Sequence, residues 1–376
     1  MSELASYSIQ AVFFALVAVV VVSSSKKTDL YQFGLISIWL IGVIAIYFRY
    51  REGQVLFYSN DQQFHQLVIE YYIPIEGFHL NAIISLRYLL TAPVYLVSLL
   101  GFSSMLTLKF LQLIFLLLLY RRTKRYLLSL GVQIRYWQLP LLAGPIMIFM
   151  STLALRDIAL AYFTFLFISS KSLNQLIIGF SGAILLRPHL GAALIIGLIV
   201  SRVIFRLQPK LTLLSISFTS LFSYVLGSFA SSIGKVLQNG LVYENPKLVF
   251  SQIKFSQLAA NFVGLQFLII DDPKKLLVAA SASTLLLSRI IFFDTLFIPL
   301  LFLVSVYRHP QYLIRQKMMT LQAFIFFYGV VSQTTWNSTR QNIPFLACMG
   351  VLAVADIEHF RKIKAKVVPK LLTATR

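Results

Sequence analysis

The chain has 376 residues, of which 58% are hydrophobic and only 12% are charged, and its mean hydropathy is +0.79. Soluble domains carry about 25% charged residues, so this composition excludes an ordinary soluble domain and indicates an integral membrane protein. Repeated apolar runs, each close to the ~20 residues that a membrane-spanning helix needs, predict an all-α, polytopic helical bundle. The sequence lacks the short alternating segments of a membrane β-barrel.

The formal net charge is +20, from 33 Lys and Arg against 13 Asp and Glu. Basic loops on the cytoplasmic side and long side chains that reach an anionic membrane surface explain most of this excess. A more specific explanation of the basic excess is that it attracts an anionic, phosphate-bearing substrate. Nucleic acid is not an expected partner, because the basic residues are divided among short loops instead of one soluble face. The single cysteine, Cys348, lies in an apolar run, which argues against a disulfide framework and a cysteine metal site.

The apolar runs predict about 11–12 transmembrane helices within a single membrane domain, residues 1–376. The first run is interpreted as a membrane helix, since no basic residue precedes it and no small-residue cleavage site follows it. Two stretches are harder to assign: Arg87 and Pro93 interrupt residues 80–100, and residues 231–288 contain amphipathic pieces. In chain order, the expected helices cover residues 9–22, 30–48, 105–120, 139–153, 158–169, 174–186, 190–205, 211–230, 290–307, 318–331 and 344–355.

Basic residues in short loops predict the orientation of a membrane bundle, because such loops stay in the cytoplasm. On this rule the cytoplasmic segments are the basic residues of 121–125, 202–210 and 308–317 and the basic tail, residues 359–376. Counting crossings backwards from the tail places the outer segments at residues 156–157, 187–189, 231–288 and 334–342. These assignments agree with one another.

The N-terminal third allows two orientations. If Lys26 and Lys27 are cytoplasmic, the external loop, residues 49–81, faces outward, and an odd number of crossings separates Asp61 from Arg121. Residues 80–100, or a neighbouring piece, then form a re-entrant or membrane-parallel segment. The opposite orientation makes this stretch an ordinary helix and places Asp61 in the cytoplasm. We favour the outward placement.

Two polar interruptions, residues 156–157 (Arg-Asp) and 187–189 (Arg-Pro-His), lie inside an otherwise apolar stretch, residues 139–200. An ionised side chain at membrane depth costs at least ~2.5 kcal/mol and usually marks a site or a pathway. The two apolar segments between them are joined by a tight turn at residues 170–172, and as helices each would rise roughly 20 Å. This hairpin predicts that two arginines, a histidine and a carboxylate converge near one membrane face.

These residue types suit the chemistry of a sugar diphosphate. Arginine binds two oxygen atoms at once with its fork of donors and keeps its charge, and a nearby carboxylate or imidazole can take a proton from a sugar hydroxyl. The candidate catalytic residues are His189, Asp61 and Asp157, in this order. The residues expected at the substrate diphosphate are Arg156, Arg187, Arg340 and Arg49, and those expected at the sugars are Trp336 and Tyr58.

Structural interpretations stand beside these functional ones. Arg87 and Lys109 are expected to snorkel towards the membrane surface. Asp157 can neutralise Arg187 as a structural ion pair, and His189 can be a hydrogen-bonded residue at a helix start. The sequence contains no glycine-rich phosphate loop, dinucleotide fingerprint or metal-binding motif, so no cofactor and no metal are expected.

Several short motifs follow one another in a set order: Arg49-Tyr50 with Gly53 and Asp61, then residues 155–159, Lys171, His189 before residues 191–195, and Arg340 before Pro344. This order resembles the EpsG/Wzy group of bacterial polysaccharide polymerases over most of residues 49–344. The chain departs from the group's pattern in the wide spacing of Gly53 and Asp61, in His65 for a tyrosine and in Asp157 for a glutamine. Residues 231–288 have no counterpart in the group.

The resemblance implies a polysaccharide polymerase that crosses the bacterial cytoplasmic (inner) membrane several times, with its active site facing the periplasm. Its substrate would be an undecaprenyl-diphosphate-linked oligosaccharide. The growing glycan would move from its polyprenyl-diphosphate carrier to the terminal sugar hydroxyl of another lipid-linked repeat unit. The leaving group is already activated, so positioning and charge stabilisation suffice. The implied partners are the lipid bilayer, a chain-length regulator and a flippase.

Two other functions are compatible with the sequence. A polyprenyl-phosphate-dependent membrane glycosyltransferase, or a ligase of the same membrane type, would keep an acidic residue in its first external loop, where this chain has Asp61. A transporter or flippase for a lipid-linked glycan would more often contain inverted repeats and broken helices at the membrane midplane, and we find no such signature in the sequence.

Overall fold

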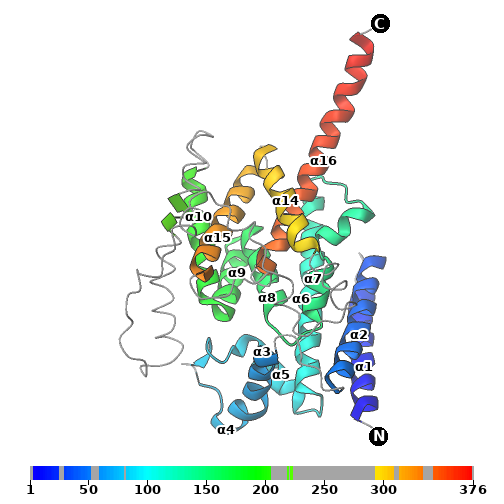
Figure 1. The fold of residues 1–376 in the computed structure, drawn as a ribbon, viewed down its shortest axis with the longest axis vertical. Coiled ribbons are helices and arrows are strands. Elements are labelled where there is room, and N and C mark those ends of the chain that lie inside the picture. The colour runs from blue at the N-terminus through cyan, green and yellow to red at the C-terminus, as the bar shows by residue number, and fades with distance from the viewer. Residues whose placement is uncertain are drawn as a thin grey trace.

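The structure is a computed structural model, and it describes residues 3–24, 29–51, 59–79, 82–204, 218–219, 221–222, 293–308, 313–332 and 342–374. Within these ranges the regular structure is helical, without a strand, so the prediction of an α-helical membrane protein is confirmed (Figure 1). The segment 231–288 and almost all of the expected helix at residues 211–230 lie outside the described residues.

In chain order the elements are α1 (Glu3–Ser23), α2 (Leu30–Arg51), α3 (Ser59–Leu67), the π-helical turn η1 (Val68–Tyr72), α4 (Ile73–Glu76), α5 (Tyr88–Ser98), α6 (Ser104–Ser129), the 3-10 turn η3 (Tyr136–Leu141), α7 (Pro145–Ser151), α8 (Asp157–Ile168), α9 (Leu173–Leu186), α10 (Pro188–Ile204), α14 (Phe293–Arg308), α15 (Ile314–Ser332) and α16 (Ile343–Ala374). Among the described residues, four stretches are long and apolar enough to cross a membrane: α1, Leu30–Phe48 of α2, α6, and Ile343–Lys362 of α16. Helices α5, α8, α9 and α10 are apolar but shorter. The larger number of crossings expected from the sequence stays a prediction.

Helix α8 forms the centre of the bundle. Every residue of α8 except Tyr162 is buried, because α6, α9 and α16 all pack against it. Two glycines let α9 approach α8 closely: a Cβ on Gly179 would lie 2.6 Å from the backbone nitrogen of Phe167, and one on Gly182 would lie 2.3 Å from the ring of Phe163. Small residues at such contacts are typical of helix packing in membranes. The two ends of the α8–α9 hairpin are therefore held at a fixed spacing.

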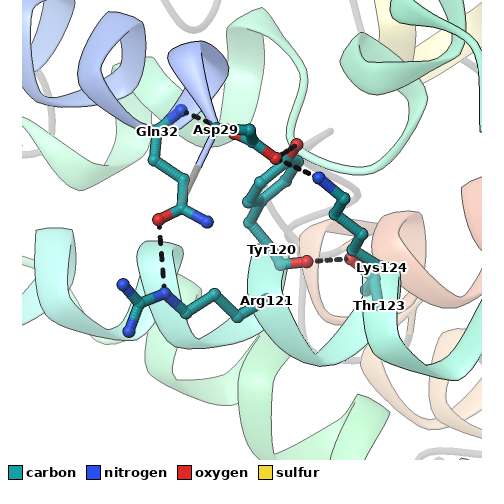
Figure 2. A network of polar contacts seen from close by, with 6 residues as sticks. All are labelled: Asp29, Gln32, Tyr120, Arg121, Thr123 and Lys124. Carbon is teal, nitrogen blue, oxygen red and sulfur yellow. Dashed lines mark hydrogen bonds and ion pairs between the residues drawn. The ribbon is translucent and has the colours of Figure 1, made fainter. Parts of the chain in front are cut away.

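At one end of the bundle, α6 is fastened to the start of α2. The carboxylate of Asp29 accepts hydrogen bonds from Tyr120 Oη at 2.8 Å and from Lys124 Nζ, and its Oδ1 accepts one from the backbone N–H of Gln32 at 3.1 Å (Figure 2). Arg121 Nε donates to Gln32 Oε1 at 3.3 Å. Asp29 thus caps the start of α2 and also neutralises a lysine of α6.

The prediction that residues 121–125 belong to a loop is wrong, because α6 continues through them to Ser129. Their side chains have partners on neighbouring helices: Arg122 Nη2 donates to Gln175 Oε1 of α9 at 2.6 Å. Lys171, in the turn between α8 and α9, donates to Ser129 Oγ at 2.9 Å. We call this region, defined by Asp29, residues 121–125 and Lys171, the basic end.

The elements α3, η1, α4 and α5 lie together at the opposite end, which also holds the N-terminus (Figure 1). The predicted external loop, residues 49–81, is therefore largely helical in its described part. Helix α5 has only 11 residues and rises about 16 Å, too little to cross a membrane. This length favours the re-entrant or membrane-parallel interpretation of residues 80–100 over an ordinary membrane helix.

The single helix predicted for residues 139–153 is wrong, since the structure has η3 and α7 there. Pro140 lies inside η3, and Pro145 begins α7 after the extended backbone of Gly144. Proline removes a backbone donor and clashes with the preceding turn of a helix, but it suits the first position of a new one. Two prolines therefore divide an apolar run that hydropathy alone joins.

Helix α16 runs for 32 residues and projects beyond the rest of the bundle (Figure 1). Its first part is buried between the other helices, and its later part includes the described residues of the predicted basic tail. Lys362 donates to the carbonyl oxygen of Gly131 at 2.9 Å. The tail is thus helical up to Ala374 and leaves the bundle near the segment that follows α6.

Candidate anion-binding site

The corner between α9 and α10 carries two of the residues expected at the site. Helix α9 ends at Leu186, Arg187 has an extended backbone (φ −156°, ψ 95°), and α10 begins at Pro188. A proline disfavours helical backbone in the residue before it, and it is favoured at the first position of a helix. Arg187 and His189 therefore flank a corner whose backbone the sequence fixes.

A short bend, residues 152–156, leads into α8. Arg156 directly precedes α8, and its Nη1 donates a 2.6 Å hydrogen bond to the carbonyl oxygen of Leu186, the last residue of α9. Carbonyl groups in the last turn of a helix lack partners within the helix, and the helix dipole favours a cation there. Arg156 thereby joins the start of α8 to the end of α9.

Asp157 and Arg187 form a buried ion pair. Arg187 Nη2 lies 3.8 Å from Asp157 Oδ1, and the two side chains are only 6% and 1% exposed. The guanidinium group also lies 5.8 Å from the ring centroid of Phe327, where a cation–π interaction is favourable. Because Asp157 neutralises a buried cation, it is the weakest of the three candidate bases.

Arg156 lies within electrostatic range of two histidines. His189, partly buried at the start of α10, interacts electrostatically with Arg187 and Arg156. His65, buried in α3, interacts electrostatically with Arg156 and Asp61 as well as with a third arginine. Arg156 therefore influences histidines on both α10 and α3.

Two side chains of α3 bind the backbone of the bend that precedes Arg156. Gln62 Oε1 accepts a 3.0 Å hydrogen bond from the N–H of Ala154, and His65 Nδ1 lies 2.9 Å from the carbonyl oxygen of the same residue. The other ring nitrogen, Nε2, lies 2.8 Å from Arg87 Nη1. A guanidinium group can only donate, so Nε2 accepts and Nδ1 carries the proton. His65 is a neutral imidazole bonded at both nitrogens.

The surroundings of His65 hold it in this neutral form. His65 lies in α3, outside the candidate membrane spans. Burial first, and the neighbouring guanidinium of Arg87 second, lower the pKa of His65 from 6.5 to about 3. His65 is therefore neutral at pH 7, and both of its ring nitrogens are engaged, by Arg87 and by the carbonyl oxygen of Ala154.

Arg87 has a strained backbone. Its φ of 55° and ψ of 44° lie in the left-handed region, and it is the one non-glycine residue with a positive φ in the part of the chain that the structure describes. This conformation costs an L-residue roughly 1–2 kcal/mol, and such strain gathers at functional sites. The guanidinium group lies 4.6 Å from the ring centroid of Phe64. Arg87 thus contacts His65 and Phe64, where the sequence suggested simple snorkelling.

The structure brings several of the predicted site residues to one place, namely Asp61, Arg156, Asp157, Arg187 and His189. Arg49 lies near the end of α2, but its side chain lies outside the described residues. The same holds for Tyr58, Trp336 and Arg340 as whole residues. His65 and Arg87 join the cluster although the sequence reasoning gave them no chemical role. We call Arg87, Arg156 and Arg187 with the two histidines His65 and His189 the arginine site.

An apolar groove of about 340 Å³ lies beside the arginine site. It is lined by Phe78, His79, Ile83, Tyr88, Leu89 and Leu185. Tyr88 directly follows Arg87, and Leu185 directly precedes the residue whose carbonyl holds Arg156. Residues of the groove and of the arginine site are therefore direct neighbours in two segments of the chain. An amphipathic anion, with a charged head and an apolar chain, matches this arrangement.

The arginine site contains the guanidinium groups of Arg87, Arg156 and Arg187 together with the carboxylates of Asp61 and Asp157. Pairs of guanidinium groups suit a diphosphate. Within the described ranges, no group of three His, Cys, Asp or Glu side chains is arranged to hold a metal ion.

Comparisons with protein-family models, with curated proteins and with solved structures found no match for this chain. The resemblance to the EpsG/Wzy polymerases therefore rests on the short motifs alone.

Proposed function

We propose that this protein is a polysaccharide polymerase of the bacterial cytoplasmic membrane, with the arginine site on its outer side. It transfers a growing glycan from a polyprenyl-diphosphate carrier to the terminal sugar hydroxyl of another lipid-linked repeat unit. The observation that carries the proposal is the convergence of Arg156, Arg187 and His189 at the corner between α9 and α10. Two guanidinium groups suit a diphosphate, and the imidazole suits a hydroxyl that loses a proton.

The transfer exchanges one bond for another at a single carbon. The acceptor hydroxyl oxygen bonds to the anomeric carbon of the donor glycan, and the bond from that carbon to the diphosphate oxygen breaks. The electron pair leaves with the polyprenyl diphosphate, whose added negative charge Arg156 and Arg187 stabilise. His189 accepts the proton of the acceptor hydroxyl. The chain's own residues thus supply both charge stabilisation and proton transfer.

The apolar groove supports a lipid-linked substrate. Its walls, including Phe78, Tyr88 and Leu185, are suited to the first isoprene units of the carrier. Burial of such a chain contributes ~25 cal/mol per Å² of apolar surface removed from water. The groove and the arginines together match the two halves of one amphipathic substrate.

Polymerisation by the purified protein tests the proposal. Lipid-linked repeat units are extracted from cells that lack this protein, incubated with the reconstituted full chain, and resolved by gel electrophoresis. Wild-type protein is expected to produce a ladder, and Arg156→Ala should slow its formation roughly 100-fold, as the loss of one oxyanion donor does in other enzymes. Arg202→Ala, an exposed arginine near the end of α10, is the matched control.

Two results would count against the proposal in different ways. Wild-type protein that binds the donor but never forms a product longer than one unit would exclude a polymerase. Equal ladders from Arg156→Ala and Arg202→Ala would exclude the arginine site as the place of reaction.

The position of Asp61 favours a second candidate function, a polyprenyl-phosphate-dependent glycosyltransferase or a ligase. Asp61 interacts with His65 and so contributes a carboxylate to the arginine site. A glycosyltransferase that uses this carboxylate as its base would lose all transfer in Asp61→Asn. A polymerase that uses His189 would keep transfer in Asp61→Asn and would differ, at most, in chain length.

A further inference from the structure

A continuous chain of contacts leads from Arg87 to the bend that carries Arg156. Arg87 Nη1 bonds to His65 Nε2 at 2.8 Å, and His65 Nδ1 bonds to the carbonyl oxygen of Ala154 at 2.9 Å. Gln62, on the same helix as His65, accepts a bond from the N–H of Ala154 at 3.0 Å. Two side chains of α3 therefore bind the N–H and the carbonyl group of Ala154, which lies two residues before Arg156.

These contacts require one form of the His65 ring. Arg87 remains charged and can only donate, so a proton on Nε2 would face a cation and break the 2.8 Å contact. A turned ring would lose the bond to Ala154 instead. The other charged groups in range of the ring are Arg156 and Asp61. The neutral imidazole with its proton on Nδ1 is the form that satisfies both bonded partners.

We propose that His65 and Arg87 are a positioning latch that holds the bend, residues 152–156, so that Arg156 is oriented before an anion binds. His65 is a positioning residue and not a base, and Arg87 acts on Arg156 through His65. That the anion is a substrate diphosphate rests on the proposed function, whereas the latch itself does not.

The latch has a direct consequence for anion affinity. A guanidinium group that is already oriented loses little conformational entropy when the anion arrives. Without the latch, α3 holds the bend only through the bond from the N–H of Ala154 to Gln62, and Arg156 must be ordered further at the moment of binding. Latch variants should therefore keep the fold and lose anion affinity.

The state of the His65 ring can be measured without any activity. The full chain, labelled with ¹⁵N-histidine, contains five histidines, and the His65→Gln variant identifies the His65 signals by their loss. We expect a protonated Nδ1 and an unprotonated Nε2 that do not change between pH 8 and about pH 5, since the pKa of His65 lies near 3. A proton on Nε2, or titration within this range, would overturn the latch.

A double-mutant cycle with inorganic pyrophosphate as the probe tests the coupling. In the wild-type background, Arg87→Ala should weaken pyrophosphate binding about tenfold, within the range of coupling between residues in one network. His65→Gln retains an acceptor near Arg87 but loses the bond to Ala154, so Arg87→Ala should have no further effect in that background. An equal loss in both backgrounds would mean that Arg87 binds the anion itself, and the latch would be rejected.

Two further variants complete the cycle. His65→Asn retains a donor near the position of Nδ1 and should recover most of the affinity, while His359→Gln, on α16, is the matched control. If His65→Asn binds no better than His65→Gln, the bond to Ala154 does not position Arg156. Wild-type protein that fails to bind pyrophosphate would contradict the proposed diphosphate site, while the ring measurement would still decide the latch.

Discussion

The two ends of the bundle use charged residues in different ways. At the basic end, Lys124 pairs with Asp29 and Arg121 with Gln32, so each cation fastens one helix to another (Figure 2). At the arginine site, the guanidinium groups of Arg156 and its neighbours lie within electrostatic range of two histidines. At the basic end the partners are side chains of neighbouring elements, which accounts for a structural role. At the arginine site the guanidinium groups lie with two histidines and beside an apolar groove, which favours a role in binding.

Electrostatics gives this comparison its physical basis. Two unit charges 4 Å apart interact by about 4 kcal/mol at an effective dielectric constant near 20. Convergent arginines are therefore unfavourable unless carboxylates, carbonyl groups or a ligand offset the repulsion. The arginine site offsets part of it through Asp157 and the carbonyl oxygen of Leu186. A bound diphosphate would add further anionic groups to these partners.

The largest expected effect is a difference between the two ends in their accessibility to an impermeant thiol reagent. In a Cys348→Ser background, Ser85→Cys, which is exposed beside α5, should react with an impermeant thiol reagent in intact cells. Asn174→Cys, exposed on α9 near the basic end, should react only after the membrane is permeabilised. The basic loops predict this difference because they stay in the cytoplasm. The reverse labelling pattern would overturn the orientation and the outward-facing site.

His189→Ala should have the next largest effect. A positioned base contributes ~10²–10⁴-fold to steps of this kind, so polymerisation should slow by that factor while the diphosphate contacts of Arg156 and Arg187 remain. Single lipid-linked units should accumulate and still bind the protein. Polymer of normal rate and length would show that His189 is structural, and the base would then be sought at Asp61.

The smallest effect belongs to the basic end. Asp29→Ala removes the cap of α2 and the acceptor for Lys124, so it should lower the free energy of unfolding by ~0.5–2 kcal/mol. Activity per folded molecule should stay unchanged. A thermal unfolding midpoint measured in detergent, alongside the polymerisation rate, checks both, with the exposed Glu76→Ala as control. A large loss of activity at an unchanged midpoint would show that the basic end takes part in the reaction and is not only structural.

The α8–α9 hairpin could be predicted closely from the sequence. The apolar segments 158–169 and 174–186 match the observed helices almost residue for residue, because polar residues and a proline bound them on both sides. The same pattern predicted the meeting of Arg187 and Asp157, since two apolar helices of similar length return the chain to the same depth. The apolar pattern of the sequence was therefore sufficient to predict this hairpin and the meeting of its two ends.

Contacts between distant segments could not be predicted in this way. The contact of Arg87 with His65 spans 22 residues and depends on a left-handed backbone that an arginine rarely adopts. The continuation of α6 through residues 121–125 depends on partners on α2 and α9 that hydropathy does not register. In the sequence, Pro140 marks the break within residues 139–153, but the apolar residues on both sides of it led to the prediction of one continuous helix.

Binding of a polyprenyl diphosphate to the purified protein tests the central claim most directly. Native mass spectrometry can compare wild type, Arg187→Lys and the matched substitution Arg121→Lys at the basic end. Lysine keeps the charge but loses the fork that binds two oxygen atoms, so Arg187→Lys should bind roughly tenfold more weakly, the scale of one hydrogen bond to a charged group. Arg121→Lys should bind as wild type does. Equal binding by wild type and Arg187→Lys would contradict the assignment of the arginine site.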